Sequence, residues 1–326
     1  MKAIICTKYG APDVLQLEEV EKPTPKDNEI LVKIHAATVT AGDTRMRKFD
    51  VPASFWLPAR LALGITKPKN KIPGMEFAGE VETVGKDVTQ HKKGDQVFAA
   101  TGMNLGSYAE YLALSGEGKD QVLAKKSSQL TYEEAATIPI GARTALYFLR
   151  EANIQPGQKV LINGASGSVG TFAVQLAKYF GAEVTAVCSG RNVALVKSLG
   201  ADKVIDYTKE DFTKNGVTYD VIFDTVGKAS LKDCLRSLHI EGTFLHAVGS
   251  PGIALRMKLA SINNKQKLVA GGPPHNPEDM LFLQELIESK KIKPVIGKRY
   301  PMEQIVAAHK LVDTGRKKGN VIIAIS

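Results

Sequence analysis

The sequence predicts an α/β fold in which a β-rich first part precedes a doubly wound parallel sheet. In the second part, five strand-like apolar segments alternate with helix-like segments, which is the pattern of strands joined by helical crossovers; the strands are expected at 159–163, 183–188, 203–206, 219–224 and 242–246. The first 125 residues instead hold short alternating runs such as 29–34 and 79–85. A chain of 326 residues also exceeds what one compact core usually organises, so two domains are expected.

The remaining elements follow in chain order. Residues 1–8 carry one charge before a five-residue apolar stretch, too short for a signal sequence, and predict a first strand. A helical segment at 132–149 is interrupted near Pro139 and Gly141, and the pair Pro156-Gly157 provides a turn before the strand at 159–163. One apolar stripe predicts a helix at 168–180. Further predicted elements are helices at 191–199, 277–289 and 301–314, and a last strand at 320–325.

Composition narrows the classes of partner. The net charge is +9, but the basic residues are spread along the chain without aromatic interleaving, so a solvated surface is favoured over a nucleic-acid site. Apolar runs are strand-sized, so no membrane span is expected. Three distant cysteines, Cys6, Cys188 and Cys234, argue against a disulfide framework and for a reducing compartment, the cytoplasm by default.

A glycine-containing turn joins the strand at 159–163 to the helix that follows it. The segment ASGSVG (165–170) matches the dinucleotide fingerprint, except that Ala165 stands where the first glycine is usual. Gly167 lets a backbone approach a pyrophosphate, Gly170 lets helix and strand pack closely, and the helix N-terminus attracts phosphate. At the head of a βαβαβ series, this turn predicts a nucleotide cofactor rather than a mere turn.

The end of the second strand favours NADPH over NADH. An NAD site usually offers an acid there to hold the ribose diol, but no Asp or Glu occurs between Glu183 and Asp202. The segment CSGRN (188–192) has Ser189 and Arg191 instead, a hydroxyl and a guanidinium that suit a 2′-phosphate. The alternative for Arg191 is a plain surface charge.

These motifs resemble the medium-chain dehydrogenase/reductase superfamily, and within it the zinc-free quinone oxidoreductase branch. The resemblance runs essentially the whole length, and its most specific segments are PGMEFAGEVETVG (73–85), KGDQVF (93–98), AATIPIGARTA (135–145), SLGAD (198–202) with VIDY (204–207), and FDTVG (223–227). It implies a GroES-like, β-rich substrate domain built from residues 1–125 and 270–326, around a Rossmann NADP-binding domain at 126–269. It also implies a homodimer or homotetramer.

The resemblance assigns cofactor contacts residue by residue. Arg191 and Tyr207, with Ser189 beside them, would contact the 2′-phosphate, and Ser166, Gly167, Ser168 and Val169 the pyrophosphate. The nicotinamide end would meet Thr144, Val226, Val248 and Asn320, with ordinary packing as the rival for the two valines.

The positions that hold catalytic zinc in alcohol dehydrogenases of this superfamily look like Thr40 and Met75 here, and neither is a normal zinc ligand. Residues 89–125 contain no cysteine for a structural zinc, and the six histidines lack ligand spacing. No metal site is therefore predicted.

Without a metal, a conjugated acceptor is the easier substrate, because hydride addition to a quinone or an α,β-unsaturated carbonyl spreads the developing charge over a delocalised anion. The sequence therefore predicts NADPH-dependent reduction of a quinone or enone. Three residues are candidates for the proton step: Thr40 and Asp43, in a cluster with Arg45 where relatives often have Asn at the first position, and Tyr108. A structural Asp43–Arg45 ion pair, a packed Tyr108 and a proton from solvent are the alternatives.

Two matters stay open. The insert at 49–71 is apolar and basic, and is either a lid over the substrate or packs on its own domain or a partner subunit. An enoyl-thioester reductase, and a catalytically weak nucleotide-binding protein of the same fold, are the rival functions.

Overall fold

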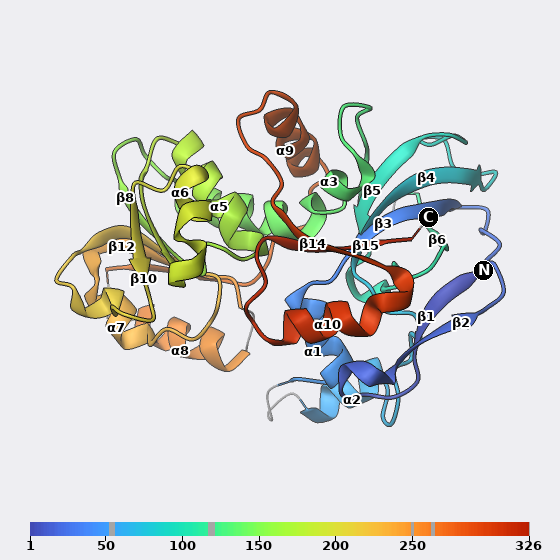
Figure 1. The fold of residues 1–326 in the computed structure, drawn as a ribbon, viewed down its shortest axis with the longest axis horizontal. Helices are drawn as coiled ribbons and strands as arrows, with labels where there is room; N and C mark the ends of the chain where they lie inside the picture. The colour runs from blue at the N-terminus through green and yellow to red at the C-terminus, as the bar shows by residue number, and fades with distance from the viewer. Residues whose placement is uncertain (52–55, 117–120, 249–250, 262–264, 326) are drawn as a thin grey trace. The chain divides into compact units, whose positions relative to one another are not determined.

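The computed structural model describes residues 1–51, 56–116, 121–248, 251–261 and 265–325 (Figure 1). Its contacts divide the chain into two compact units. Unit 1 comprises Met1–Ile140, His275–Glu288 and Ile296–Ser326, and unit 2 comprises Gly141–Pro274 and Ser289–Val295. The domain boundaries expected after residues 125 and 269 stay a prediction.

Unit 1 is built on strands from both ends of the chain, which pair antiparallel except for the parallel pair at its C-terminal edge, β14 with β15. Within its described residues, a seven-stranded sheet runs in the order β14-β15-β3-β4-β5-β7, with β6 added on β3, and β1 and β2 pair separately. The strands are β1 (Lys2–Cys6), β2 (Leu15–Glu19), β3 (Glu29–Thr38), β4 (Glu76–Val84), β5 (Gln96–Ala100), β6 (Tyr111–Ser115), β7 (Val122–Lys125), β14 (Ile296–Pro301) and β15 (Asn320–Ala324). The alternating runs at 29–34 and 79–85 therefore do lie in strands, β3 and β4.

Unit 1 also contains short helices. The α-helices are α1 (Ala41–Lys48), α2 (Trp56–Leu63), α3 (Tyr132–Ala135), α9 (Glu278–Glu288) and α10 (Ile305–Asp313), with 3-10 turns η1 (Pro12–Val14), η3 (Gly102–Asn104) and η7 (Met302–Gln304). Helix α10 packs beside α1 (Figure 1). Apolar side chains of β3, β4 and β15 and of α10 share one buried core, for example Ile30, Phe77, Ile323 and Ala308.

Unit 2 is the predicted doubly wound parallel sheet. Its six described strands run in the order β10-β9-β8-β11-β12-β13 and all pair in parallel. They are β8 (Lys159–Asn163), β9 (Glu183–Cys188), β10 (Lys203–Asp206), β11 (Tyr219–Asp224), β12 (Leu238–His246) and β13 (Lys267–Ala270). The chain moves outward from β8 to β10 and then returns to β11, so the order reverses between β8 and β11. Ligands of such sheets bind at the carboxyl ends of the strands beside this reversal.

The helices of unit 2 show where sequence-based bounds were wrong. They are α4 (Arg143–Glu151), α5 (Ser168–Tyr179), α6 (Val193–Ser198), α7 (Leu231–Arg236) and α8 (Pro251–Ser261), with 3-10 turns η5 (Gly190–Asn192) and η6 (Phe212–Lys214). The helix predicted at 191–199 begins as the turn η5, and α7, α8 and β13 were not predicted. The segment at 132–149 divides into α3, a π-helical turn η4 (Ile138–Ala142) and α4, because Pro139 has no N–H to donate.

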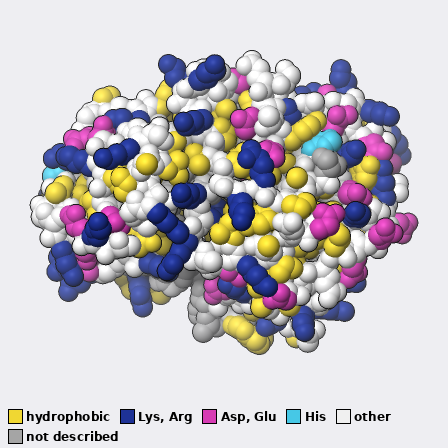
Figure 2. All heavy atoms as spheres, viewed as in Figure 1, with side chains coloured by type: hydrophobic (Ala, Val, Ile, Leu, Met, Phe, Trp, Pro, Cys, Tyr) yellow, Lys and Arg dark blue, Asp and Glu magenta, His cyan; other side chains and the backbone are white. Residues whose placement is uncertain are grey.

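The surface agrees with a mixed distribution of charge. On the face shown in Figure 2, lysine and arginine side chains are spread among acidic and apolar ones. No helix in the described part of the chain has the length and apolar character needed to cross a membrane.

Candidate functional site

The turn between β8 and α5 is the first part of the candidate cofactor site, and its tight bend lies at Gly164. This residue has φ +83°, and a Cβ there would lie 2.4 Å from Val226 Cγ2 and 2.5 Å from Thr225 Oγ1. Only glycine fits a left-handed backbone under such contacts. The residue that makes the turn is thus one position before Ala165, where the fingerprint places its first glycine.

The two later glycines of the turn have different surroundings. A Cβ on Gly170 would lie 2.2 Å from the Gly164 carbonyl oxygen and 2.7 Å from Ala165 Cα, so helix and turn are in direct backbone contact. A Cβ on Gly167 would meet only the Gly164 oxygen, at 3.4 Å. Gly167 is also the N-cap of α5 and has no side chain to cap the helix. The space over Gly167 and the positive end of α5 together suit a pyrophosphate.

The candidates for the 2′-phosphate come together at the ends of β9 and β10. Cys188 and Asp206, the last residues of these strands, are paired, and the Tyr207 N–H donates to the Cys188 carbonyl at 3.1 Å. Ser189 follows directly in one loop, and Arg191 lies in its 3-10 turn with an exposed side chain. Tyr207 is also exposed. The structure therefore brings Ser189, Arg191 and Tyr207 to one corner of the sheet.

Two residues that the sequence did not single out hold this corner. Asn192 is buried, and its amide Nδ2 donates to Ser166 Oγ at 2.9 Å, which joins the Arg191 loop to the glycine turn. Asp206 accepts a hydrogen bond from the Gly190 N–H, and a Cβ on Gly190 would lie 2.5 Å from Asp206 Oδ2. The only sequence signal for Asn192 was its place beside Arg191. The role of Asp206 could not be read from the sequence, because it depends on which strands are neighbours in the sheet.

Asp224 organises the turn at the other side of β8. This fully buried carboxylate accepts from Asn163 Nδ2 and from the N–H groups of Val226 and Gly227, each at 3.0 Å. Burial opposes ionisation, but these hydrogen bonds and His246, whose Nδ1 lies 3.7 Å away, hold the Asp224 pKa below its ordinary value. Asp224 is thus a fixed negative charge that ties the β11 turn to the end of β8.

Two of the predicted nicotinamide residues, Val226 and Val248, lie at this turn. Val226 is partly exposed, and a Cβ on Gly227 would lie 2.9 Å from Val248 Cβ, so Val248 packs on the turn. Thr144 is partly buried in the first turn of α4. A cavity of about 320 Å³ opens beside the turn, lined by Gly227, Ala229, Leu231, Phe244, His246, Val248, Gly252 and Arg256.

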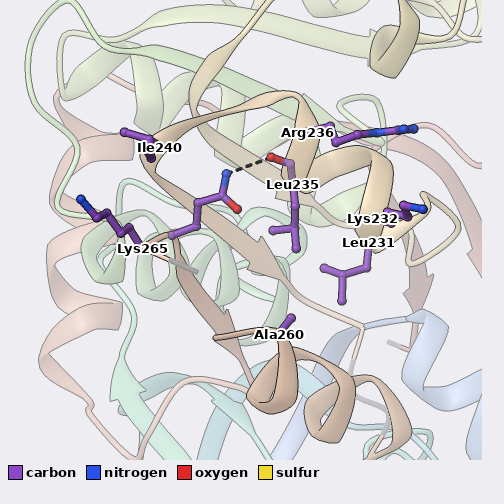
Figure 3. Close-up of a pocket in the computed structure, with 8 residues that line it drawn as sticks. Leu231, Lys232, Leu235, Arg236, Ile240, Ala260 and Lys265 are labelled. Carbon is purple, nitrogen blue, oxygen red and sulfur yellow. Dashed lines mark hydrogen bonds between the residues drawn. The ribbon is translucent and has the colours of Figure 1, made fainter. Parts of the chain in front are cut away.

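A second cavity of unit 2 lies beside α7, near the first residues of β12 and β13, the strands farthest from β10 in the sheet. It has a volume of about 490 Å³ and is lined by Leu231, Lys232, Leu235, Arg236, Ile240, Ala260, Lys265 and Gln266 (Figure 3). Gln266 donates to the Leu235 carbonyl oxygen at 2.8 Å across it. Leu235 and Gln266 precede the first residues of β12 and β13, whereas the glycine turn follows the last residue of β8. This cavity contains no predicted site residue.

In unit 1, Thr40 and Asp43 form the N-terminal capping box of α1. Asp43 Oδ2 accepts from the Thr40 N–H at 2.8 Å and from its hydroxyl at 2.6 Å, while the Asp43 N–H donates to Thr40 Oγ1 at 3.1 Å. Burial raises the Asp43 pKa to about 6, against the lowering effect of these bonds. Thr40 therefore hydrogen-bonds Asp43, and the Tyr108 hydroxyl lies beside the same carboxyl group.

Tyr108 is buried, and its hydroxyl donates to the Thr38 carbonyl oxygen at 2.9 Å. Burial, with Asp43 beside it, raises the Tyr108 pKa well above 10, so the phenol stays neutral. It lies in a bend before β6.

A second carboxyl group, missed in the sequence, lies in the same unit. Glu76 is fully buried; its Oε1 accepts from the Thr38 hydroxyl, and its Oε2 accepts from the Ile140 N–H at 2.7 Å. Burial raises the Glu76 pKa to about 8. Partly buried Lys317 donates to the Gly319 carbonyl at 3.0 Å; burial lowers its pKa to about 8, and Glu76 and Asp43 act against that shift.

The two positions compared with zinc ligands are close in space. A Cβ on Gly42 would lie 2.9 Å from Met75 Sδ and 3.3 Å from Thr40 Oγ1. The thioether and hydroxyl at these positions are poor ligands for zinc. Among the described residues, no group of three or more His, Cys, Asp or Glu side chains is arranged to hold a metal ion. Asn320, the remaining candidate, is buried at the start of β15.

Comparison with known proteins agrees with this architecture. Residues 26–125 match the alcohol dehydrogenase GroES-like domain, and residues 199–323 match the zinc-binding dehydrogenase domain. A 2-methylene-furan-3-one reductase of Solanum lycopersicum is 34% identical over 99% of this chain and 79% of its own length. An NADPH-dependent alkenal/one oxidoreductase of Arabidopsis thaliana is 30% identical with the same coverage. A quinone oxidoreductase of Sus scrofa is 32% identical over 100% of this chain and 98% of its own.

A solved structure shows the same fold over its full length. The quinone oxidoreductase from Coxiella burnetii superposes with a TM-score of 0.88 at 29% identity, covering 100% of this chain and 99% of that one. The predicted fold class, a GroES-like domain with a Rossmann-type parallel sheet, is thereby confirmed. The chain belongs to the medium-chain dehydrogenase/reductase superfamily of oxidoreductases.

Proposed function

We propose that this protein is an NADPH-dependent, zinc-independent reductase of quinones or α,β-unsaturated carbonyl compounds. The observation that supports nucleotide binding is the turn at Gly164–Gly170. At Gly170 the backbone of α5 packs directly on the turn, whereas space remains above Gly167. NADPH, when bound, supplies the hydride. The protein supplies position: the α5 N-terminus for the pyrophosphate, and the Ser189, Arg191 and Tyr207 corner for the 2′-phosphate.

The class of acceptor is inferred from Thr40 and Met75, which stand at the positions compared with zinc ligands. A simple carbonyl needs a strong electrophile to stabilise its alkoxide, and these two side chains hold no zinc for that purpose. A conjugated acceptor delocalises the charge, so hydrogen bonds suffice. Three relatives at 30% identity or more, named for furanone, alkenal/one and quinone reduction, support this class of acceptor.

Hydrogen bonds of the Thr40 and Tyr108 hydroxyls bear on the proposed source of the proton. The Thr40 hydroxyl donates to Asp43 and the Tyr108 hydroxyl donates to the Thr38 carbonyl, so both protons are already engaged. We propose that Asp43 and Tyr108 orient Thr40, and that water donates a proton to the anion that hydride addition forms. Hydride and proton together then complete the two-electron reduction.

One experiment tests both the nucleotide and the class of acceptor. NADPH oxidation is followed with ortho- and para-quinones, alkenals and crotonyl thioesters, with zinc content measured in the same preparation. Turnover of quinones or alkenals without stoichiometric zinc is expected. Preference for the thioester would favour an enoyl reductase, and NADPH binding without turnover of any acceptor would favour a binding protein.

Arg191→Ala tests the cofactor choice. The KM for NADPH should rise about tenfold or more while that for NADH changes little, because only NADPH presents the 2′-phosphate. Arg236→Ala is the matched control, since Arg236 lines the cavity beside α7. Equal effects of Arg191→Ala on both nucleotides would remove the 2′-phosphate assignment.

We also propose a homodimer or homotetramer in the cytoplasm. Strand β13 ends the described sheet of unit 2 and can accept a further strand. All three cysteines are buried and free of disulfides, which suits a reducing compartment. Analytical ultracentrifugation and imaging of a tagged chain test these two statements.

A further inference from the structure

No acid lies at the end of β9, but an acid from the neighbouring strand β10 lies beside it. Asp206 ends β10, directly beside Cys188 of β9. Its Oδ2 faces Gly190, where an added Cβ would lie at 2.5 Å, and the carboxylate accepts the Gly190 N–H. The corner formed by Ser189, Arg191 and Tyr207 therefore also contains a carboxylate.

This carboxylate is held in place by a second loop. Asp206 Oδ1 accepts from the Thr208 hydroxyl at 2.8 Å and from the Thr208 N–H at 3.1 Å. These bonds, the side-chain one first, lower the Asp206 pKa, so the group stays ionised at neutral pH. Asp206 is thus a fixed negative charge one residue from Tyr207, and it touches the residue before Arg191.

The position of this charge bears on the choice between nucleotides. A 2′-phosphate at this corner brings a dianion close to Asp206, which repels it, while Arg191 attracts it. A ribose without the phosphate presents two hydroxyls, which donate well to a carboxylate. The Gly190 N–H, a natural donor to a phosphate, is already bonded to Asp206.

We propose that Asp206 is a specificity-determining residue that opposes Arg191 at the adenosine end and narrows the preference for NADPH, so that this protein also accepts NADH. The inference rests on the proposed nucleotide site and adds a residue to it. The neighbouring Thr208 bonds fix the carboxylate, and Gly190 leaves room for it.

The test measures binding of two fragments, 2′,5′-ADP and 5′-AMP, by isothermal titration calorimetry of the full chain. Asp206→Asn removes the charge but keeps a carbonyl oxygen for Thr208. We expect it to raise the affinity for 2′,5′-ADP relative to 5′-AMP by about three- to tenfold, the effect of one nearby charge in a solvated site. The gain should shrink in high salt, because screening weakens the repulsion.

Asp211→Asn is the matched control. Asp211 Oδ1 accepts from the Thr213 N–H at 3.0 Å and from the Thr213 hydroxyl at 2.7 Å, the same local geometry as Asp206, but at a position outside the corner. It should leave the ratio of affinities unchanged. Melting temperatures of both variants show whether either substitution unfolds the loop.

The outcomes separate the two proposals. An Asp206→Asn ratio that is unchanged or lower than in the wild type, or one that rises equally in Asp211→Asn, overturns the role of Asp206 while the nucleotide site stands. Failure of the wild type to bind either fragment overturns the nucleotide site and Asp206 with it. A raised ratio specific to Asp206→Asn supports the proposal without any measurement of turnover.

Discussion

The contact at Gly170 gives a prediction whose size can be worked out from the structure. In Gly170→Ala, the new methyl group would lie 2.2 Å from the Gly164 oxygen and 2.8 Å from the Ala165 carbonyl carbon, all backbone atoms. Relief requires a shift of about 1 Å between α5 and the turn, and overpacking of this kind costs about 1–3 kcal/mol. Alanine is a better helix former than glycine by about 1 kcal/mol. The net expectation is a loss of up to about 2 kcal/mol.

The assay compares thermal unfolding with NADPH binding. For a unit of this size, the apparent Tm should fall by up to about 8 °C. The affinity for NADPH, measured by fluorescence titration, should fall with it, because the same shift moves the Gly167 backbone. Gly272→Ala is the control: no atom lies within 4 Å of its added Cβ, and it shares the loss of unfolded-state entropy.

One result would refute the reasoning. If Gly170→Ala melts at or above the temperature of Gly272→Ala and binds NADPH normally, helix propensity outweighs the contact, and the close approach is not required.

Two further predictions concern buried polar groups. Glu76→Gln mimics the neutral acid: with a folded pKa of about 8 against 4.5, Glu76 stabilises the fold below pH 4.5, and this contribution is lost as the pH rises through 8. In urea unfolding, the free energy of unfolding of the variant should therefore rise relative to that of the wild type between pH 5 and 8, by up to about 1.4 kcal/mol per pH unit. Parallel pH profiles of the two proteins would contradict this. Asn192→Ala removes the bond to Ser166 and should weaken NADPH binding about three- to tenfold by calorimetry. An affinity within twofold of the wild type would exclude a positioning role for Asn192.

Much of unit 2 was predictable because its signals are local. Apolar runs of strand length between helical stripes indicate a parallel sheet, and this arrangement places the glycine turn at the carboxyl end of β8. Strands at 159–163 and 219–224 were predicted with their observed bounds. Helix α8 was not, because its apolar residues follow no single stripe that distinguishes it from a loop.

The partners of the site residues could not be predicted in the same way. Thr40 and Asp43 are three residues apart, so their capping box is visible in the sequence, whereas Glu76 meets Thr38 and Ile140 only through the fold. Asn192 and Ser166 likewise belong to loops after different strands.

The acid at the cofactor corner shows the difference most clearly. Along the chain, the stretch after Glu183 contains no Asp or Glu before Asp202, and this favours NADPH. In the sheet, β10 lies beside β9, so Asp206 reaches Gly190 from a neighbouring strand. By itself the sequence determined the kind of sheet, the glycine turn and the residues that follow each strand, because periodicity and turn chemistry are local. Only the tertiary structure decided which charges share a corner, because strand order and register bring residues together irrespective of their distance along the chain.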